Sequence, residues 1–211
     1  MAVGTSDILR WLETSQKVFA ENRQRLTEMD QAVGDGDFGL SLDRGFTAVQ
    51  AELTAKPPTE LKAVFNSVAS VLIKTMGGSS GPLLGTFFMR AGATCAGKSE
   101  LGAADVAALF SAGVEGLQQR GKAEVGDKTM LDAFIPGVAA MRAAADAGGS
   151  LNDVLDQGVA AAEAGAEATT QMQARKGRGS YLGERSVGHP DPGAVAAHLL
   201  LKVAADEWRE S

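Results

Sequence analysis

Apolar side chains recur at intervals of three and four residues along most of this chain, which is the spacing of amphipathic helices. Ile8, Leu12 and Leu26 mark the apolar face of the first helix. Thr5 or Ser6 is its expected N-cap, because a side-chain hydroxyl can accept a hydrogen bond from a free amide at a helix start. No segment of alternating β-branched residues stands out, so the pattern predicts an all-α fold.

Turn-forming and helix-breaking residues divide the rest of the chain into seven further segments with helical spacing. The expected helices cover residues 41–53, 60–76 with Thr59 as N-cap, 83–95, 103–120, a sixth that opens at Asp127, 150–172 and 192–208. Pro136 lies inside the sixth helix, where it should kink or restart the axis. The whole chain, residues 1–211, is therefore expected to form a single domain, a barrel or bundle of about eight antiparallel helices joined by short loops.

Composition and charge exclude several classes of protein. Aromatic residues make up only 5% of the chain and alanine is abundant, so helices can pack closely. The net charge of −6 is unfavourable for a general nucleic-acid binder and for attraction to an anionic membrane surface. A single cysteine, Cys95, excludes an internal disulfide framework and a cysteine-based metal site. The chain shows neither a signal peptide nor a membrane span of roughly 20 apolar residues, so a cytoplasmic location without a membrane partner is expected.

The most informative stretch is MDQAVGDGDFG at residues 29–39, in which Asp30, Asp35 and Asp37 are separated by glycines. Glycines at this density indicate a loop. Three uncompensated carboxylates in one loop repel each other and raise one another's pKa, and few lysines or arginines lie nearby in the sequence. A divalent cation is their natural partner, and oxygen ligands indicate Mg²⁺ or Ca²⁺. An ordinary acidic turn without metal is the alternative.

Three familiar motifs are rejected, two on structural context and one on its residues. Residues 34–39 fit the dinucleotide fingerprint G-x-G-x-x-G, but a helical run precedes them where a strand is required. An EF-hand that starts at Asp35 needs Glu at its twelfth position, which is Phe46. Residues 92–99 fit the P-loop pattern G-x-x-x-x-G-K-[ST], but they also follow a helix, so they are interpreted as a helix exit with Ser99 near the next cap.

Four glycine-containing loops are expected to meet at one end of the molecule, because alternate loops of an up-and-down bundle lie at the same end. The loops cover residues 34–45, 77–85, 120–130 and 174–193. Each opens a helix, whose free amides and positive dipole end suit phosphate. Ser79 and Ser80 add hydroxyl donors. Carboxylates for a cation together with amides for phosphate predict a metal–nucleotide site at this end.

The last of these loops is unusually long for a compact domain, and such loops are often functional. It concentrates cations in an acidic chain, namely Arg175, Lys176, Arg178 and Arg185. The alternative is an ordinary surface loop. The two histidines, His189 and His198, form no legible triad with a nucleophile. Phosphoryl transfer needs no protein nucleophile, since positioning and charge neutralisation suffice, so no catalytic side chain is assigned.

These motifs together resemble the nucleotide-binding subunit of dihydroxyacetone kinase, and the resemblance covers essentially the whole chain. It rests on GDGDFG, GGSSGPLLGTFF, RGKAEVGDKTMLD and MQARKGRGSYLGERSVGHPDPGA. The stand-alone subunit of the phosphotransferase-system type is the nearer match, and the equivalent domain of single-chain ATP-dependent kinases is the alternative. The resemblance implies a barrel of eight antiparallel helices with the nucleotide capping one end. It also implies that Asp30, Asp35 and Asp37 hold two Mg²⁺ ions.

The resemblance further implies which residues contact ADP or ATP and which proteins act as partners. The implied nucleotide contacts are Phe38, Gly39, Leu40, Ser41, Ser79, Ser80, Gly121, Met130, Arg178, Asp191, Pro192 and Gly193. A separate subunit holds the triose covalently on a histidine and receives the γ-phosphate. In the phosphotransferase type, ADP stays bound as a cofactor and is rephosphorylated in place by a phosphohistidine of a third protein.

Phe38 departs from the stand-alone bacterial subunits, which usually carry His after the second Asp of GDxD. Phe cannot donate to phosphate through its side chain, although its backbone amide can. The phosphoryl donor, free ATP or a phosphoprotein, and the identity of the ketose therefore remain open. Two alternatives to a kinase subunit also remain, a non-catalytic nucleotide-loaded regulator of a transcription factor and a purely structural helical domain.

Overall fold

The computed structural model describes residues 2–209, which are almost entirely helical. Its α-helices are α1 (Thr5–Val33), α2 (Phe38–Ala55), α3 (Leu61–Thr75), α4 (Ser80–Ala93), α5 (Ala103–Gly121), α6 (Leu131–Asp146), α7 (Leu151–Ala168) and α8 (Pro192–Trp208). Two 3-10 helices follow α7, η1 (Thr169–Gln171) and η2 (Arg178–Ser186). The prediction of an all-α fold with about eight helices is confirmed. The antiparallel pair of two-residue strands, β1 (Val3–Gly4) and β2 (Glu100–Leu101), was not predicted.

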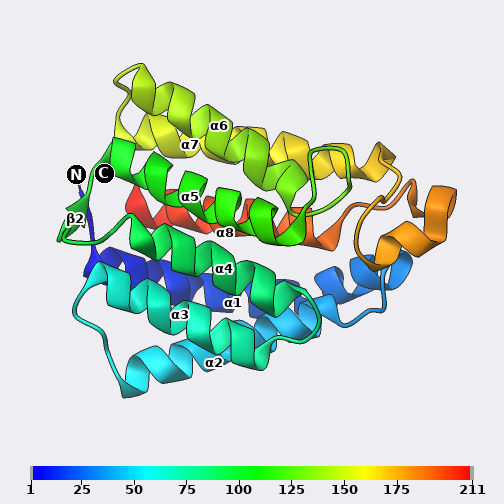
Figure 1. Ribbon diagram of the computed structural model, residues 1–211, viewed down its shortest axis with the longest axis horizontal. Helices are drawn as coiled ribbons and strands as arrows, with labels where there is room; N and C mark the ends of the chain where they lie inside the picture. The colour runs from blue at the N-terminus through cyan, green and yellow to red at the C-terminus, as the bar shows by residue number, and fades with distance from the viewer. Residues whose placement is uncertain (1, 210–211) are drawn as a thin grey trace.

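The helices close into a barrel because each packs against its neighbours in the sequence and α8 returns to pack against α1. Figure 1 shows the helices side by side, with both chain ends at one end of the barrel and η2 at the other. None of the helices within residues 2–209 is long and apolar enough to cross a bilayer.

Aromatic side chains fill the barrel near the chain termini. The Trp11 ring lies 5.1 Å from the Trp208 ring and 5.8 Å from the Phe110 ring, measured between centroids. Trp11 Nε1 donates to the Leu200 carbonyl at 3.0 Å, so the buried indole keeps a hydrogen-bond partner. Because these rings occupy the end that holds the termini, the opposite end is available for a site.

Proline inside α6 does not interrupt the helix, which runs continuously through Pro136. Pro136 has no amide hydrogen, so the Asp132 carbonyl lacks its helical donor. Gly165 of α7 packs directly against this carbonyl, and a Cβ at Gly165 would lie 2.1 Å from its oxygen. The expected close packing of helices through small residues is confirmed at this contact.

Several helix boundaries differ from the sequence prediction. Gly4, not Thr5 or Ser6, is the N-cap of α1, and its amide donates to Asp7 Oδ2 at 2.7 Å. Glu60, not Thr59, is the N-cap of α3. At the other end of the barrel, α2 begins earlier than expected, α6 begins four residues later and α7 ends earlier. The starts of α2 and α6 follow from side-chain hydrogen bonds of the site described below.

The P-loop-like segment, residues 92–99, follows helix α4 and not a strand, as expected. Lys98 forms an ion pair with Asp105, and the N-cap of α5 is Gly102, three residues beyond Ser99. Cys95 is buried. The segment connects to β2 near the chain ends, away from η2 (Figure 1), so it takes no part in the site at the other end.

Candidate functional site

Four connections meet at the end of the barrel that carries η2, namely α1–α2, α3–α4, α5–α6 and α7–α8. Together they enclose a cleft of about 620 Å³. Clefts of roughly 300–1,000 Å³ are typical of small-molecule sites. The expected convergence of alternate loops is therefore confirmed, and it places the starts of α2, α4, α6 and α8 around one cavity.

Most of the residues singled out from the sequence line this cleft. They are Asp30, Asp35, Asp37, Phe38, Ser79, Ser80, Gly121, Met130, Arg178, Asp191, Pro192 and Gly193. Gly39, Leu40 and Ser41 are not among the lining residues. Gly39 packs against α1, where a Cβ would lie 2.3 Å from the Arg23 carbonyl, and Leu40 is 50% exposed.

Ser41 lies behind the cleft and holds one of its loops. Its Oγ accepts hydrogen bonds from the Gly77 amide at 3.0 Å and from Arg44 Nη2 at 3.2 Å. Arg44 also donates through Nε to the Thr75 carbonyl at 2.9 Å. Ser41 therefore reaches the cleft through the α3–α4 loop and not through its own hydroxyl.

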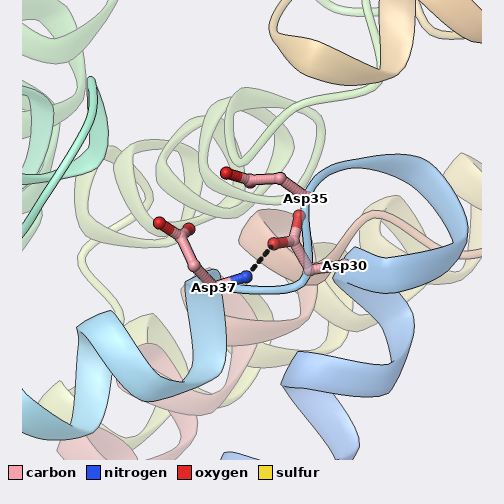
Figure 2. A group of neighbouring side chains, drawn as sticks. All are labelled: Asp30, Asp35 and Asp37. Carbon is pink, nitrogen blue, oxygen red and sulfur yellow. Dashed lines mark hydrogen bonds between the residues drawn. The ribbon is translucent and has the colours of Figure 1, made fainter.

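The three carboxylates predicted to hold a metal come together at the α1–α2 connection. Asp30, Asp35 and Asp37 each offer an oxygen within 4.8 Å of the other two. Figure 2 shows the three side chains grouped at the turn, with Asp30 linked to the backbone nitrogen of Asp37. Gly34 has no Cβ, which would otherwise lie 2.2 Å from Asp30 Oδ1. The glycine thus leaves room for this carboxylate at the base of the cluster.

Asp30 also accepts hydrogen bonds that explain why α2 begins earlier than the sequence predicts. Its Oδ2 accepts hydrogen bonds from the Asp37 amide at 2.9 Å and the Phe38 amide at 3.1 Å. Asp30 thus satisfies two free amides at the start of α2 from a different helix. Asp37 occupies the N-cap position, yet its own side chain makes no cap bond. Its carboxylate is therefore available to a ligand.

The cluster carries more negative charge than its neighbours neutralise. Burial raises the pKa of Asp30, which is 9% exposed, and repulsion from Asp35 and Asp37 adds to this effect, whereas the two backbone hydrogen bonds oppose it. Within residues 2–209, one ion pair reaches these three carboxylates, that of Arg178 Nη1 with Asp35 Oδ2 at 2.9 Å. This oxygen-only, electron-rich donor set fits a hard divalent cation such as Mg²⁺.

The other walls of the cleft suit polyphosphate. Arg120, Lys176 and Arg178 line it. Ser79 and Ser80 stand at the start of α4, where free amides and the helix dipole favour an anion. The cleft therefore combines carboxylates for a cation with donors for phosphate, as the sequence predicted. His189 is exposed and does not line the cleft, and His198 lies on α8.

Phe38 directs its ring into the barrel core, where it is 8% exposed. Its amide, which was expected to be available to phosphate, donates to Asp30. The Phe38 ring therefore belongs to the apolar packing beneath the cleft.

Two buried polar residues were absent from the sequence prediction, Lys128 in the α5–α6 connection and Asp132 in the first turn of α6. Asp132 is 1% exposed and accepts from the Gly126 amide at 2.5 Å and the Thr129 amide at 2.7 Å. Lys128 is 2% exposed. Asp132 bonds to amides three and six residues away, whereas Lys128 bonds to carbonyls 44 and 58 residues away. The bonds of Asp132 form the turn that delays the start of α6 to Leu131.

The carboxyl of Asp191 should make the stability of the fold depend on pH. Burial raises the pKa of this carboxyl to about 7, and Asp132 and Asp30 add repulsion. The folded state binds this proton more tightly than the unfolded state does, so the stability that protonation contributes is complete below about pH 4 and is lost as the pH rises through 7.

Replacing Asp191 with Asn removes this titration but keeps the helix cap, because Asn can still accept from the Ala194 amide. In urea unfolding of the metal-free protein between pH 4.5 and 8, the free energy of unfolding of Asp191→Asn should fall much less with rising pH than that of the wild type. An unchanged decline would contradict the raised pKa.

Comparison with known proteins assigns this helical barrel and its cleft to a family. Residues 32–206 match the DAK2 domain, and the chain belongs to this family. It is 38% identical over 205 residues to the ADP-binding subunit DhaL of the PEP-dependent dihydroxyacetone kinase of Escherichia coli (strain K12), a match that covers 97% of this chain and 98% of that protein. It is also 41% identical to human triokinase/FMN cyclase, over 85% of this chain and 31% of that protein.

The crystal structure of the dihydroxyacetone kinase of C. freundii in complex with AMP-PNP and Mg²⁺ superposes with a TM-score of 0.73 at 28% identity. The superposition covers 94% of this chain and 33% of that one. The family and the phosphotransferase class predicted from the sequence are confirmed, and so is the helical-barrel fold.

Proposed function

We propose that this chain is the ADP-binding subunit of a dihydroxyacetone kinase. It binds Mg–ADP or Mg–ATP in the cleft and passes the γ-phosphate to dihydroxyacetone held by a partner subunit. The observation that carries the proposal is the meeting of three carboxylates with several helix N-termini around one cavity of about 620 Å³. The name of the E. coli relative, which matches over nearly its whole length, supports the same function.

In this proposal Asp30, Asp35 and Asp37 hold two Mg²⁺ ions, which neutralise charge on the phosphates. The amides and hydroxyls at the start of α4, with Ser79 and Ser80, orient the phosphate chain. The remaining cleft residues from the sequence prediction surround the nucleotide. They are Gly121, Met130, Arg178, Asp191, Pro192 and Gly193, together with Phe38. No side chain of the chain acts as a nucleophile, because positioning and charge neutralisation carry phosphoryl transfer.

We further propose that residues 1–211 form one nucleotide-binding domain that works in the cytoplasm with two partners. One is the substrate-binding subunit, and the other is a phosphohistidine protein that rephosphorylates bound ADP. The E. coli relative, which is matched over 98% of its length, is named as a subunit of a PEP-dependent kinase, and this supports the two partners. The Phe38 ring packs into the barrel core, so its presence is compatible with a polar cleft that binds a nucleotide.

Denaturing the purified chain and assaying released nucleotide tests the donor. Retained ADP supports its role as a bound cofactor, whereas an empty site supports exchange with free ATP. The phosphoprotein or ATP is then supplied with a substrate-binding subunit loaded with dihydroxyacetone. Formation of dihydroxyacetone phosphate supports the proposal. An intact metal site without transfer to any partner-held ketose would favour a non-catalytic regulator.

Because Arg178 pairs with Asp35, replacing Arg178 should have opposite effects on the affinity for a metal ion alone and on the affinity for the nucleotide. Without ligand, the guanidinium competes with a cation for Asp35. Arg178→Gln should therefore tighten binding of Mn²⁺ alone about two- to fivefold, since an exposed ion pair is worth about 0.2–1 kcal/mol. It should weaken Mg–ADP about tenfold or more, because hydrogen bonds to charged groups contribute about 1.5–3 kcal/mol.

Mn²⁺ electron paramagnetic resonance and calorimetry measure the two affinities. Lys176→Gln is the matched control, because Lys176 lies in the same loop and lines the cleft but forms no ion pair with the described carboxylates. Weaker Mn²⁺ binding in Arg178→Gln would contradict the competition.

A further inference from the structure

The buried ammonium of Lys128 lies at the base of the long α7–α8 loop. Lys128 Nζ donates to the Met172 carbonyl at 3.0 Å and to the Ser186 carbonyl at 2.6 Å. Met172 precedes the loop segment 173–185 and Ser186 follows it. One side chain from the α5–α6 connection therefore binds the backbone on both sides of this segment.

Backbone contacts strengthen the same junction. The Ala174 amide donates to Ser186 Oγ at 2.9 Å, and the Arg175 amide donates to the Asp127 carbonyl at 3.0 Å. Lys128 itself has a left-handed backbone with φ of +61°, which is uncommon for a residue with a side chain and persists where the surroundings stabilise it. The base of the loop is thus fixed to the α5–α6 connection by several bonds.

Between its two anchored ends, the segment reaches the carboxylates. Arg178 follows Gly177, whose φ is +64°, and forms the ion pair with Asp35. Lys176, Gly177 and Gly179 line the cleft beside it. The direction in which the loop leaves its base therefore decides where the Arg178 guanidinium lies.

Burial of the charged Lys128 ammonium is unfavourable, and its role at the base of the loop accounts for this burial. Burial lowers the pKa of Lys128, and attraction from Asp191 partly offsets the effect. An ammonium this deeply buried is unfavourable unless its donors are used, and here two of the three are directed at carbonyls at the base of the loop. Lys128 is also among the residues that line the cleft, but these two donors are committed to the loop carbonyls and not to a ligand.

We propose that Lys128 is a positioning residue that holds both ends of segment 173–185 and thereby places Arg178 opposite the carboxylates and the bound phosphates. This inference rests on the proposed function, because the phosphates are those of the nucleotide. It assigns Lys128 an effect through Arg178 and no contact of its own with the nucleotide.

Hydrogen exchange of the ligand-free protein tests the anchoring without reference to the nucleotide. Lys128→Met should raise amide exchange within 173–185 about tenfold or more and leave α3 and α4 unchanged. Lys122→Met is the control, because Lys122 has a similar left-handed backbone in the same connection but is exposed. Unchanged exchange in the loop of Lys128→Met would overturn the inference while leaving the proposed function intact.

A double-mutant cycle on Mg–ADP affinity separates positioning from a general loss of structure. If Lys128 acts through Arg178, the Lys128→Met and Arg178→Gln double variant should bind no more weakly than Arg178→Gln alone. Additive losses would overturn the inference. A wild-type chain that binds no Mg–ADP would overturn the proposed function as well, whatever the exchange experiment shows.

Reductive methylation of the wild-type chain covers the case in which Lys128→Met does not fold. Mass spectrometry should find Lys128 modified at least about tenfold more slowly than Lys122, because its ammonium is buried and hydrogen-bonded. Equal reactivity of the two lysines would overturn the anchoring role.

Discussion

Replacing Asp37 with Asn should lower Mg²⁺-dependent nucleotide binding and phosphoryl transfer by at least about 100-fold. Loss of a residue that merely supports a metal ligand costs about 10–100-fold, so loss of a ligand's charge costs at least the upper part of that range. Among the described residues, Asp37 is the member of the trio whose side chain neither bonds to helix-start amides nor pairs with an arginine. Its substitution therefore removes metal binding with little effect on the fold.

Asp43→Asn is the matched control for Asp37→Asn, because Asp43 lies on the same helix and pairs with Arg23 outside the cluster. It should retain near wild-type affinity for Mg–ADP in calorimetry and near wild-type transfer in a coupled assay. Full activity of Asp37→Asn would exclude this carboxylate from the metal site.

Replacing Asp30 with Asn should have opposite effects on stability and on function. The pKa of Asp30 is raised in the fold, so its stabilising contribution is present below the ordinary carboxyl range and is lost as the pH rises through the raised pKa. At neutral pH the ionised group is therefore destabilising when no metal is present. The Asn side chain can still accept from the Asp37 and Phe38 amides, so the start of α2 keeps its cap.

Thermal unfolding in EDTA at pH 7.5 should thus show Asp30→Asn at or above the wild-type midpoint. The stabilisation that Mg–ADP gives the wild type, about 2.7 kcal/mol at a ligand concentration 100 times Kd, should disappear. A lower midpoint in EDTA would contradict the charge argument, and a retained Mg–ADP shift would contradict the assignment of Asp30 to the metal.

The parts of the fold that could be predicted depend on local pattern. Apolar spacing predicted the helices, and the expected range 192–208 matches α8, in which proline occupies the first helical turn and Asp191 caps it. Alternation of loops then brought the acidic loop and the loop of Ser79 together at one end. The candidate cleft could therefore be predicted from the sequence.

The parts that could not be predicted depend on contacts between residues distant in the chain. The start of α2 is set by Asp30, a residue of α1. The base of the α7–α8 loop is held by Lys128, whose partners lie 44 and 58 residues away. Ser41 was expected at the nucleotide, but its hydroxyl holds Gly77 instead. Neither periodicity nor turn composition encodes such pairings.

A crystal grown with MnCl₂ and ADP tests the central claim most directly, because Mn²⁺ replaces Mg²⁺ and gives an anomalous signal. The account predicts two anomalous peaks among Asp30, Asp35 and Asp37, with the ADP phosphates beside them in the cleft. Ordered ADP elsewhere, or a carboxylate cluster without an anomalous peak at saturating Mn²⁺ and ADP, would contradict it.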